Sequence, residues 1–184
     1  MKGVVFSELV DWIEQRYGVE VVDEVLLEAE LPHGGAYTTA GTYDWREVHA
    51  IVTALAARIA HTADDVLRSY GRHLFPVFAE RFAGIIGRTT DPLDLLAGIG
   101  AHIEDEVVKL YADSELPTFR VERTPDGLVL DYESARPFAS LAHGMIEGCF
   151  LHFGVDADVK MTGGGNRRRF DIAVPPEAKC PATR

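Results

Sequence analysis

The sequence predicts an α+β protein in which helices fill the first two-thirds of the chain and a sheet follows. Up to about residue 111, apolar residues recur at intervals of three and four, which is the spacing of one helix face. Beyond residue 118, apolar and polar residues alternate over short runs, as they do in half-buried strands. Turn-forming residues separate these runs, so the pattern indicates a four-stranded antiparallel sheet with one inserted helix.

The first two helices are delimited by residues that stop helices. A stripe of apolar residues predicts a helix over residues 6–17, and Gly18 is a typical C-terminal stop. A second helix is predicted over residues 21–31, where Pro32 and a Gly-Gly loop end the pattern.

Two capping patterns predict the starts of the third and fourth helices. Asp44 with Glu47, and Thr62 with Asp65, have the spacing at which two side chains satisfy the free N–H groups of a first turn. Pro76 should kink or break the fourth helix just before it, because proline has no N–H to donate.

Further helical patterns lead up to the sheet. Residues 78–86 continue an apolar stripe, and Asp91 followed by Pro92 is a typical helix start. The pattern that begins at Asp91 runs to about Tyr111, so one long helix is expected there.

The remaining segments predict two hairpins and a helix. Residues 119–123 and 128–132 alternate around a tight turn, which indicates the first hairpin. An apolar stripe over residues 137–153 predicts the inserted helix, and residues 157–161 and 169–174 predict the second hairpin.

Composition excludes several classes of partner. Twenty-nine acidic and 18 basic residues give a net charge of −11, which argues against nucleic acid and against anionic membrane surfaces. We recognise no signal peptide, and no apolar run is long enough to span a bilayer. Cys149 and Cys180 do not make a disulfide framework, so a reduced, cytoplasmic setting is expected. The basic run 167–169 follows three glycines and is interpreted as an exposed hairpin corner.

One short polar segment is the first candidate site. If residues 131–136 run extended, Tyr132, Ser134 and Arg136 point to the same side. A phenol, a hydroxyl and a guanidinium fork can together hold one or two carboxylates. A half-exposed strand with polar residues outside would give the same pattern.

His102 is the second candidate among seven histidines. It lies on the helix that begins at Asp91, at the edge of an apolar stripe, where a packed core histidine is the alternative interpretation. Haem needs an axial donor for its iron and donors for two propionates at one edge. His102 and the Tyr-x-Ser-x-Arg segment could supply both.

At these residues the chain resembles the haem-nitric oxide/oxygen-binding (H-NOX) domains, bacterial gas sensors related to the haem domain of soluble guanylate cyclase. The fragments that carry the resemblance, in chain order, are Met1-Lys2-Gly3, His102, Leu116-Pro117, Tyr132-x-Ser134-x-Arg136 and Gly144-Met145-Ile146-Glu147-Gly148. The resemblance implies a single haem domain over residues 1–176 and a tail over residues 177–184. Within that domain it implies an N-terminal helical subdomain (1–60) and a haem-ligating part with the sheet (61–176).

The resemblance also implies roles for single residues. His102 would be the iron ligand, and Tyr132, Ser134 and Arg136 would hold the propionates of ferrous haem b. Pro117 matches a family proline that presses on the haem, although a loop proline that ends a helix is an equally simple interpretation. The residues implied for the distal wall of the pocket are Val5, Leu9, Leu74, Phe78, Leu141 and Met145.

The identities of the distal residues predict the gas. Family members that bind oxygen stably place a tyrosine and polar assistants over the iron, and here those positions correspond to Leu141, Leu9 and Leu74. Without a hydrogen-bond donor, bound oxygen loses a stabilising contact that nitric oxide needs much less. We therefore predict binding of nitric oxide and carbon monoxide, with poor oxygen binding. His73, next to Leu74, could act as a donor if it turns inward.

The implied mechanism is sensing rather than catalysis. Nitric oxide would break the iron–His102 bond, and the N-terminal helices would shift against the sheet. The chain contains no phosphate-binding loop, kinase motif or cyclase segment, so a separate effector is expected, such as a histidine kinase or a cyclic-di-GMP enzyme. Two cysteines predict no zinc site. The alternatives are an oxygen-binding sensor, a peroxidase-like haem enzyme and a haem-free interaction module.

Overall fold

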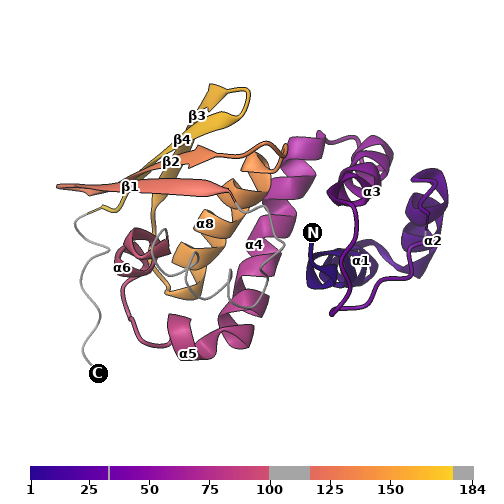
Figure 1. Ribbon diagram of the computed structural model, residues 1–184, viewed down its shortest axis with the longest axis horizontal. Coiled ribbons are helices and arrows are strands. Elements are labelled where there is room, and N and C mark those ends of the chain that lie inside the picture. The colour runs from indigo at the N-terminus through magenta and orange to yellow at the C-terminus, as the bar shows by residue number, and fades with distance from the viewer. Residues whose placement is uncertain (33, 100–116, 176–184) are drawn as a thin grey trace.

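The computed structural model describes residues 1–32, 34–99 and 117–175. Its helices are α1 (Gly3–Tyr17), α2 (Val19–Glu28), α3 (Trp45–Arg58), α4 (Ala63–Arg81), α5 (Ala83–Ile86), α6 (Pro92–Ala97) and α8 (Ala139–His152). Its strands are β1 (Thr118–Thr124), β2 (Gly127–Glu133), β3 (Asp158–Gly164) and β4 (Arg167–Ala173). Figure 1 shows α1, α2 and α3 grouped at one end of the molecule and the sheet toward the other, with α4 and α8 between them.

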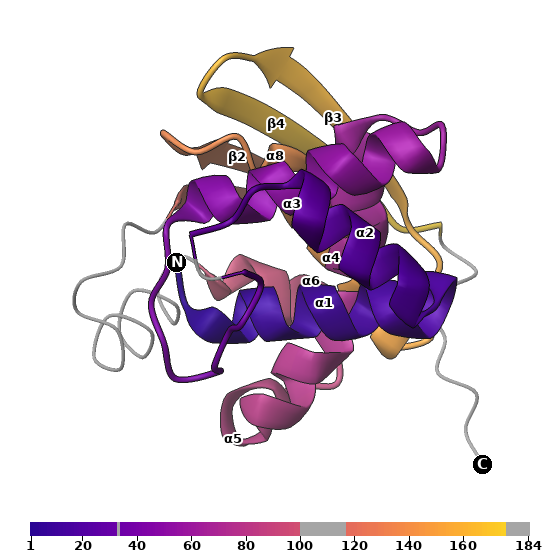
Figure 2. The same cartoon turned by 90° about the vertical axis from the view of Figure 1, so that its right-hand side faces the viewer.

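The first two helices pack on each other at the end of the molecule that faces the viewer in Figure 2. The buried face of α1 consists of Gly3, Val4, Phe6, Leu9, Trp12 and Ile13. Gly18 ends α1 with a φ of 94°, as predicted. By contrast, α2 ends at Glu28 and not at residue 31. Glu30 has a φ of 48°, a left-handed conformation through which a right-handed helix cannot continue.

The two predicted capping patterns have different outcomes. Thr62 and Asp65 form a complete capping box at the start of α4. Asp44 caps α3 by accepting a backbone N–H of the first turn. Glu47 does not reciprocate, because its buried carboxylate instead accepts a hydrogen bond of 2.9 Å from the Tyr37 hydroxyl. Only one of the two boxes is therefore formed as predicted.

Two predicted helix boundaries lie elsewhere. Of the expected kink or break before Pro76, the break is wrong, because α4 continues through Pro76 to Arg81. Packing of α4 along α8 offsets the hydrogen bond that the proline removes. The long helix expected from Asp91 ends at Ala97, and Asp91 caps it as predicted. The remainder of that predicted helix lies largely outside the described residues. In the part of the chain that the structure describes, no helix combines the length and apolarity needed to cross a bilayer.

The sheet is antiparallel with strand order β1-β2-β4-β3. Alternate residues of its central strands face α8, and those that are buried include Leu128, Leu130, Phe170 and Ile172. Their partners on α8 in the same apolar cluster include Ile146, Cys149 and Phe150. The predicted α+β class, with four strands and an inserted helix, is confirmed.

Two apolar clusters meet along α4 and α8. The first cluster joins α1, α2 and α3 to the N-terminal half of α4, with Leu74 as its last fully buried residue on that helix. The second joins the sheet to Phe75 and Ala79 of α4 and to the later turns of α8. Because both helices contribute to both clusters, α4 and α8 form the common wall between the helical end and the sheet.

Candidate functional site

The candidate carboxylate clamp, formed by Tyr132, Ser134 and Arg136, lies at the end of β2. β2 ends at Glu133, and residues 135–137 form a bend, so the expected extended conformation stops before Ser134. Burial nevertheless keeps alternating across the bend: Tyr132 is buried and Ser134 and Arg136 are half-buried, whereas Glu133 is exposed. The three residues therefore share an inward orientation despite the end of the strand.

Local hydrogen bonds fix this bend. The N–H of Ser134 donates to the Asn166 carbonyl at 2.9 Å, which ties the segment to the turn before β4. The Ser134 Oγ atom accepts the N–H of Arg136 at 3.1 Å, and the N–H of Phe138 donates to the Arg136 carbonyl at 2.9 Å. Ser134 Oγ accepts there, so its own O–H proton can donate, as it does in the hydrogen bond with Tyr132.

The Tyr132 hydroxyl stays protonated in this setting. Its ring makes T-shaped contacts with Phe119 and Phe170, at centroid distances of 5.6 and 6.2 Å. Burial raises the pKa of Tyr132, while a hydrogen bond with Ser134 and the charges of nearby arginines oppose the rise without cancelling it. At neutral pH the phenol is therefore a hydrogen-bond donor.

Arg168 is a further cation at the clamp that the sequence analysis missed. It pairs with Tyr132 in the β2–β4 register, and its charge acts on the Tyr132 phenol. Arg168 is half-buried, and its Nη1 atom donates to the carbonyls of Gly165 and Arg167 at 2.8 and 3.0 Å. Arg168, Phe170 and Ile172 have the i, i+2, i+4 spacing of one strand face, so the sequence could have predicted an inward orientation for Arg168. The interpretation of residues 167–169 as an exposed corner led us to overlook it.

The six residues of the predicted distal wall gather in one apolar cluster. They come from α1, α4 and α8, and the cluster contains Leu9, Leu74 and Leu141 as buried members and Val5, Phe78 and Met145 as half-buried ones. α8 begins at Ala139, directly after the clamp segment, so Leu141 lies only five residues beyond Arg136. The fold thus places the apolar wall next to the candidate clamp segment in the chain.

Tyr70 is a second residue that the sequence analysis missed. It is fully buried in the same cluster, and its hydroxyl donates to the Val5 carbonyl at 2.6 Å. Burial raises its pKa well above the ordinary value, so the phenol is neutral. Its single proton is committed to a backbone carbonyl, which leaves no donor for another ligand.

His73 lies beside Tyr70, with ring centroids 6.4 Å apart. The residue as a whole is half-buried, but its Nε2 atom is covered and has no hydrogen-bond partner within the described residues. A buried ring nitrogen of this kind is a candidate hydrogen-bonding group for a ligand.

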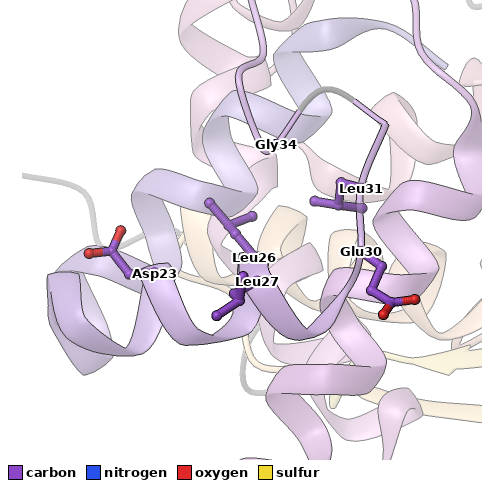
Figure 3. Close-up of a pocket in the computed structure, with 6 residues that line it drawn as sticks. All are labelled: Asp23, Leu26, Leu27, Glu30, Leu31 and Gly34. Carbon is purple, nitrogen blue, oxygen red and sulfur yellow. The ribbon is translucent and has the colours of Figure 1, made fainter.

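The other candidate residues are placed less fully. Pro117 is half-buried and directly precedes β1. His102 and Cys180 lie outside the described residues. Burial raises the pKa of the Cys149 thiol to about 12, so this cysteine is neutral. Within the described ranges, no group of three or more His, Cys, Asp or Glu side chains could hold a metal ion. The surface hollow in Figure 3 is lined by none of the candidate site residues, and its lining residues are Asp23, Leu26, Leu27, Glu30, Leu31 and Gly34.

Glycines allow α4 and α8 to approach backbone to backbone. A Cβ atom on Gly71 would lie 2.3 Å from the Leu141 carbonyl oxygen, and one on Gly144 would lie 2.0 Å from the Arg68 carbonyl oxygen. Any larger residue at either position would push the helices apart. The distal-wall residues Leu74 and Leu141 therefore depend on these glycines for their separation.

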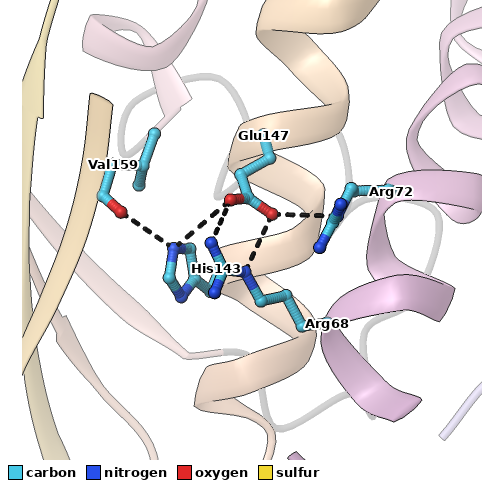
Figure 4. Close-up of polar contacts among 5 residues, drawn as sticks. All are labelled: Arg68, Arg72, His143, Glu147 and Val159. Carbon is cyan, nitrogen blue, oxygen red and sulfur yellow. Dashed lines mark hydrogen bonds and ion pairs between the residues drawn. The ribbon is translucent and has the colours of Figure 1, made fainter. Parts of the chain in front are cut away.

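A polar cluster fastens the same two helices (Figure 4). The Glu147 carboxylate on α8 accepts from Nε of Arg68 and pairs with Nε of Arg72, both at 3.0 Å, and Arg68 makes a second bond through Nη2. His143 Nε2 lies 3.1 Å from the Val159 carbonyl and 3.7 Å from Glu147. A carbonyl only accepts, so Nε2 carries a proton and donates to β3.

The charges in this cluster set its protonation. Burial and the charge of Arg68 lower the pKa of His143 against the opposing effect of Glu147, so the imidazole is neutral at pH 7. Burial would raise the pKa of Glu147, but the hydrogen bond and charge of Arg68 and the charge of Arg72 outweigh burial and hold the pKa below its ordinary value. The cluster is thus a carboxylate held by two guanidinium groups, tied to the sheet by a neutral histidine.

Together, the described residues fit the chemistry of haem. Neutral hydroxyl donors and a guanidinium lie at the end of β2, as two propionates require. An apolar wall built from three helices follows directly in the chain and suits a porphyrin face.

Comparison with known proteins decides the family. The model of the haem-NO-binding family matches residues 2–161, which is most of the chain. This chain belongs to the haem-NO-binding (H-NOX) family. H-NOX proteins are haem-binding gas-sensor domains, and the resemblance seen in the sequence is confirmed.

Solved H-NOX structures share the fold over nearly its whole length. The Fe(II) unliganded H-NOX protein from K. algicida is 35% identical with a TM-score of 0.88, and the match covers 95% of this chain and 97% of that one. The S. oneidensis H-NOX protein in the Fe(II)NO state is 29% identical with a TM-score of 0.87, covering 95% and 99%. The IWP-051-bound H-NOX from Shewanella woodyi in the Fe(II)CO state is 33% identical with a TM-score of 0.81, covering 100% and 99%.

Proposed function

We propose that this H-NOX chain is a cytoplasmic bacterial sensor that binds nitric oxide and carbon monoxide at ferrous haem b and binds oxygen poorly. It is not an enzyme, and it signals to a separate effector protein. The observation that supports the proposal is the burial of Leu9, Leu74 and Leu141 in one apolar cluster. The resemblance aligns these three leucines with the positions that supply polar contacts to bound oxygen in other members of the family.

The residues that hold the haem follow from their chemistry. His102 is the iron ligand, and Tyr132, Ser134 and Arg136 bind the propionates as neutral and charge-assisted donors. Pro117, half-buried before β1, presses on the haem. Haem supplies the iron at which a diatomic gas binds. The protein supplies the apolar wall, and in the described residues that wall offers no pair of acid–base groups suited to peroxide cleavage.

Gas selectivity follows from the missing donor. A hydrogen bond to bound oxygen contributes roughly 0.5–1.5 kcal/mol net, and more in a dry pocket. The range without the dry-pocket increase corresponds to roughly two- to tenfold in affinity for a single bond, and the increase makes the factor larger. Tyr70 does not replace the missing donor, because its proton is held by the Val5 carbonyl.

Signalling requires a movement that a partner can detect. We propose that rupture of the iron–His102 bond lets the helical subdomain (1–60) shift relative to residues 61–176. A partner that binds the two arrangements with different affinity then reads the signal. A histidine kinase or a cyclic-di-GMP enzyme is the proposed class of effector, and the proposal includes no zinc, nucleic-acid or membrane partner.

The test is spectroscopic. Ferrous protein reconstituted with haem is expected to bind nitric oxide with the absorption spectrum of five-coordinate iron and to form no stable oxygen complex in air. His102→Gly should lose haem unless imidazole is supplied. Unchanged haem retention by that variant would assign the iron ligand to another residue, and no Soret band after reconstitution would favour a haem-free interaction module.

A second candidate function is stable oxygen binding, and one observation favours it. The Nε2 atom of His73 is buried without a hydrogen-bond partner in the described residues, and the residue adjoins Leu74. If His73 supplied the donor, the wild-type protein would hold oxygen in air and His73→Leu would lose it. Absence of an oxygen complex in the wild type would eliminate this candidate.

A further inference from the structure

The outer face of α2 carries a stripe of two exposed aliphatic residues with an aspartate between them. Val19 is 51% exposed and Leu27 is 81% exposed, although both are large aliphatic residues. Together with Asp23 they are spaced by four residues along α2, so they lie on one face of the helix. Figure 2 shows α2 in front of α4 at the end of the molecule opposite the sheet. Val19 and Leu27 are therefore exposed to water, whereas Val22 and Val25 bury the opposite face of α2 in the core.

A hollow continues this stripe at the C-terminal end of α2. It has a volume of about 320 Å³ and is lined by Asp23, Leu26, Leu27, Glu30, Leu31 and Gly34. Figure 3 shows the leucines between the carboxylates of Asp23 and Glu30. A hollow of this size accepts one aliphatic or aromatic side chain.

Gly35 lets the loop after α2 approach the helix closely. Gly34 and Gly35 have φ values of 58° and 81°, which other residues rarely adopt. A Cβ atom on Gly35 would lie 2.6 Å from the Leu26 side chain. The loop after α2 is therefore packed directly on Leu26 and shapes the hollow in advance of binding.

The rim of the hollow is acidic. α2 contains four carboxylates and no basic residue. Glu24 forms an ion pair with Arg58 of α3, but Asp23 and Glu30 have no ion-pair partner within the described residues. Carboxylates on both sides of exposed Leu27 favour a partner that carries basic residues on both sides of an apolar one.

We propose that this α2 patch, formed by Val19 and the residues that line the hollow, docks a basic amphipathic helix of the effector protein. One apolar side chain of that helix enters the hollow, and its flanking lysines or arginines pair with Asp23 and Glu30. The inference names the partner chemistry for the signalling proposed above and rests on that proposed function. Since α2 lies within residues 1–60, a partner docked there would follow the subdomain that is proposed to move.

The experiment uses the full chain and a stand-in for the partner helix. The probe is a fluorescent peptide of about 18 residues, with leucine at helical i, i+3, i+4 and i+7 spacing and lysine elsewhere. Leu27→Ser and the double variant Asp23→Lys/Glu30→Lys are each expected to weaken binding at least about tenfold, as a central contact should. In amide NMR spectra, the peptide should shift the signals of α2 and of the following loop.

Matched controls separate docking from general attraction to an acidic protein. Leu151→Ser removes another exposed leucine, which is 67% exposed on α8. The double variant Glu122→Lys/Asp126→Lys makes the same charge change at exposed positions of the first hairpin. Both controls should change peptide affinity by less than about twofold. Equal losses in controls and patch variants, or shifts centred away from α2, would overturn the inference.

Two further outcomes are distinct. Self-association of the protein that Leu27→Ser abolishes would overturn the inference in favour of a second copy of this chain. The peptide measurement requires no gas and can be made with and without haem. If the protein binds the peptide at α2 but takes up no haem, only the proposed function is refuted. If the protein binds haem and gas but does not bind the peptide, only docking at the α2 patch is refuted.

Discussion

Removal of the Glu147 carboxylate should show how firmly α4 and α8 are joined. Its side chain is 19% exposed and contacts two guanidinium groups from α4, which are 40% and 44% exposed. A hydrogen bond to a charged group contributes about 1.5–3 kcal/mol when desolvated. Solvent screening of the half-exposed arginines reduces this value. We therefore expect Glu147→Ala to lower the free energy of unfolding by about 2 kcal/mol, below the cost of breaking a fully buried pair.

The assay is urea unfolding followed by circular dichroism, on wild type and variants with the same haem content. Asp171→Ala is the matched control, because it removes an exposed pair with Arg169 whose side chains are 45% and 50% exposed. That control should cost less than about 0.5 kcal/mol. A loss in Glu147→Ala no larger than the control would show that the cluster is ordinary surface chemistry and would refute the reasoning.

Acid should weaken the same contact. The pKa of Glu147 is lower in the folded chain than in the unfolded one, because Arg68 and Arg72 outweigh the effect of burial. Its contribution is therefore fully present above the unfolded pKa, about 4.3, and is lost as the pH falls through the folded value. The difference in stability between wild type and Glu147→Gln should accordingly shrink below about pH 4. A difference that stays constant to lower pH would contradict the assigned ion pairs.

Three more predictions address the pocket. Gly144→Ala should cost about 1–3 kcal/mol in thermal unfolding, because its Cβ would meet the Arg68 carbonyl, whereas Gly164→Ala meets nothing within 4 Å and should be nearly neutral; equal effects would refute the close helix contact. Arg136→Ala should speed haem transfer to an acceptor globin by about tenfold or more, since a propionate loses a charge-assisted partner, and an unchanged rate would remove Arg136 from the clamp. Leu141→Tyr should create an oxygen complex in air, and intact nitric oxide binding without it would show that Leu141 does not face the bound gas.

Local signals predicted the elements where local contacts decide them. The cap at Thr62, the stop at Gly18 and the alternating strands all depend on neighbours in the chain, and all are present. The errors arise where distant contacts prevail. α4 continues through Pro76 because it packs along α8. Glu47 does not complete the capping box because its carboxylate accepts a hydrogen bond from Tyr37 in a buried setting. The spacing of residues in the sequence predicts neither of these two contacts.

The site also has residues that local sequence patterns predict and residues that only distant contacts bring together. The alternation of side-chain direction along a strand predicted a common face for Tyr132, Ser134 and Arg136, and the same rule applied to β4 would have added Arg168. The convergence of leucines from three helices came from the family resemblance, since a leucine stripe is typical of any core. The contact between Arg68 and Glu147 spans 79 residues, and no periodicity in a single sequence links two such positions.

The contacts of α4 indicate where the two parts of the fold can move. Toward α8, the joint combines glycine-mediated backbone contact with directional hydrogen bonds to Glu147, and even a small slide would break both. Toward α1, the contact is made largely by aliphatic and aromatic side chains, and the hydrogen bond from Tyr70 to the Val5 carbonyl crosses it. Apolar contacts are non-directional and allow sliding at low cost. A shift of the N-terminal helices should therefore occur between α1 and α4, with α4, α8 and the sheet moving as one body.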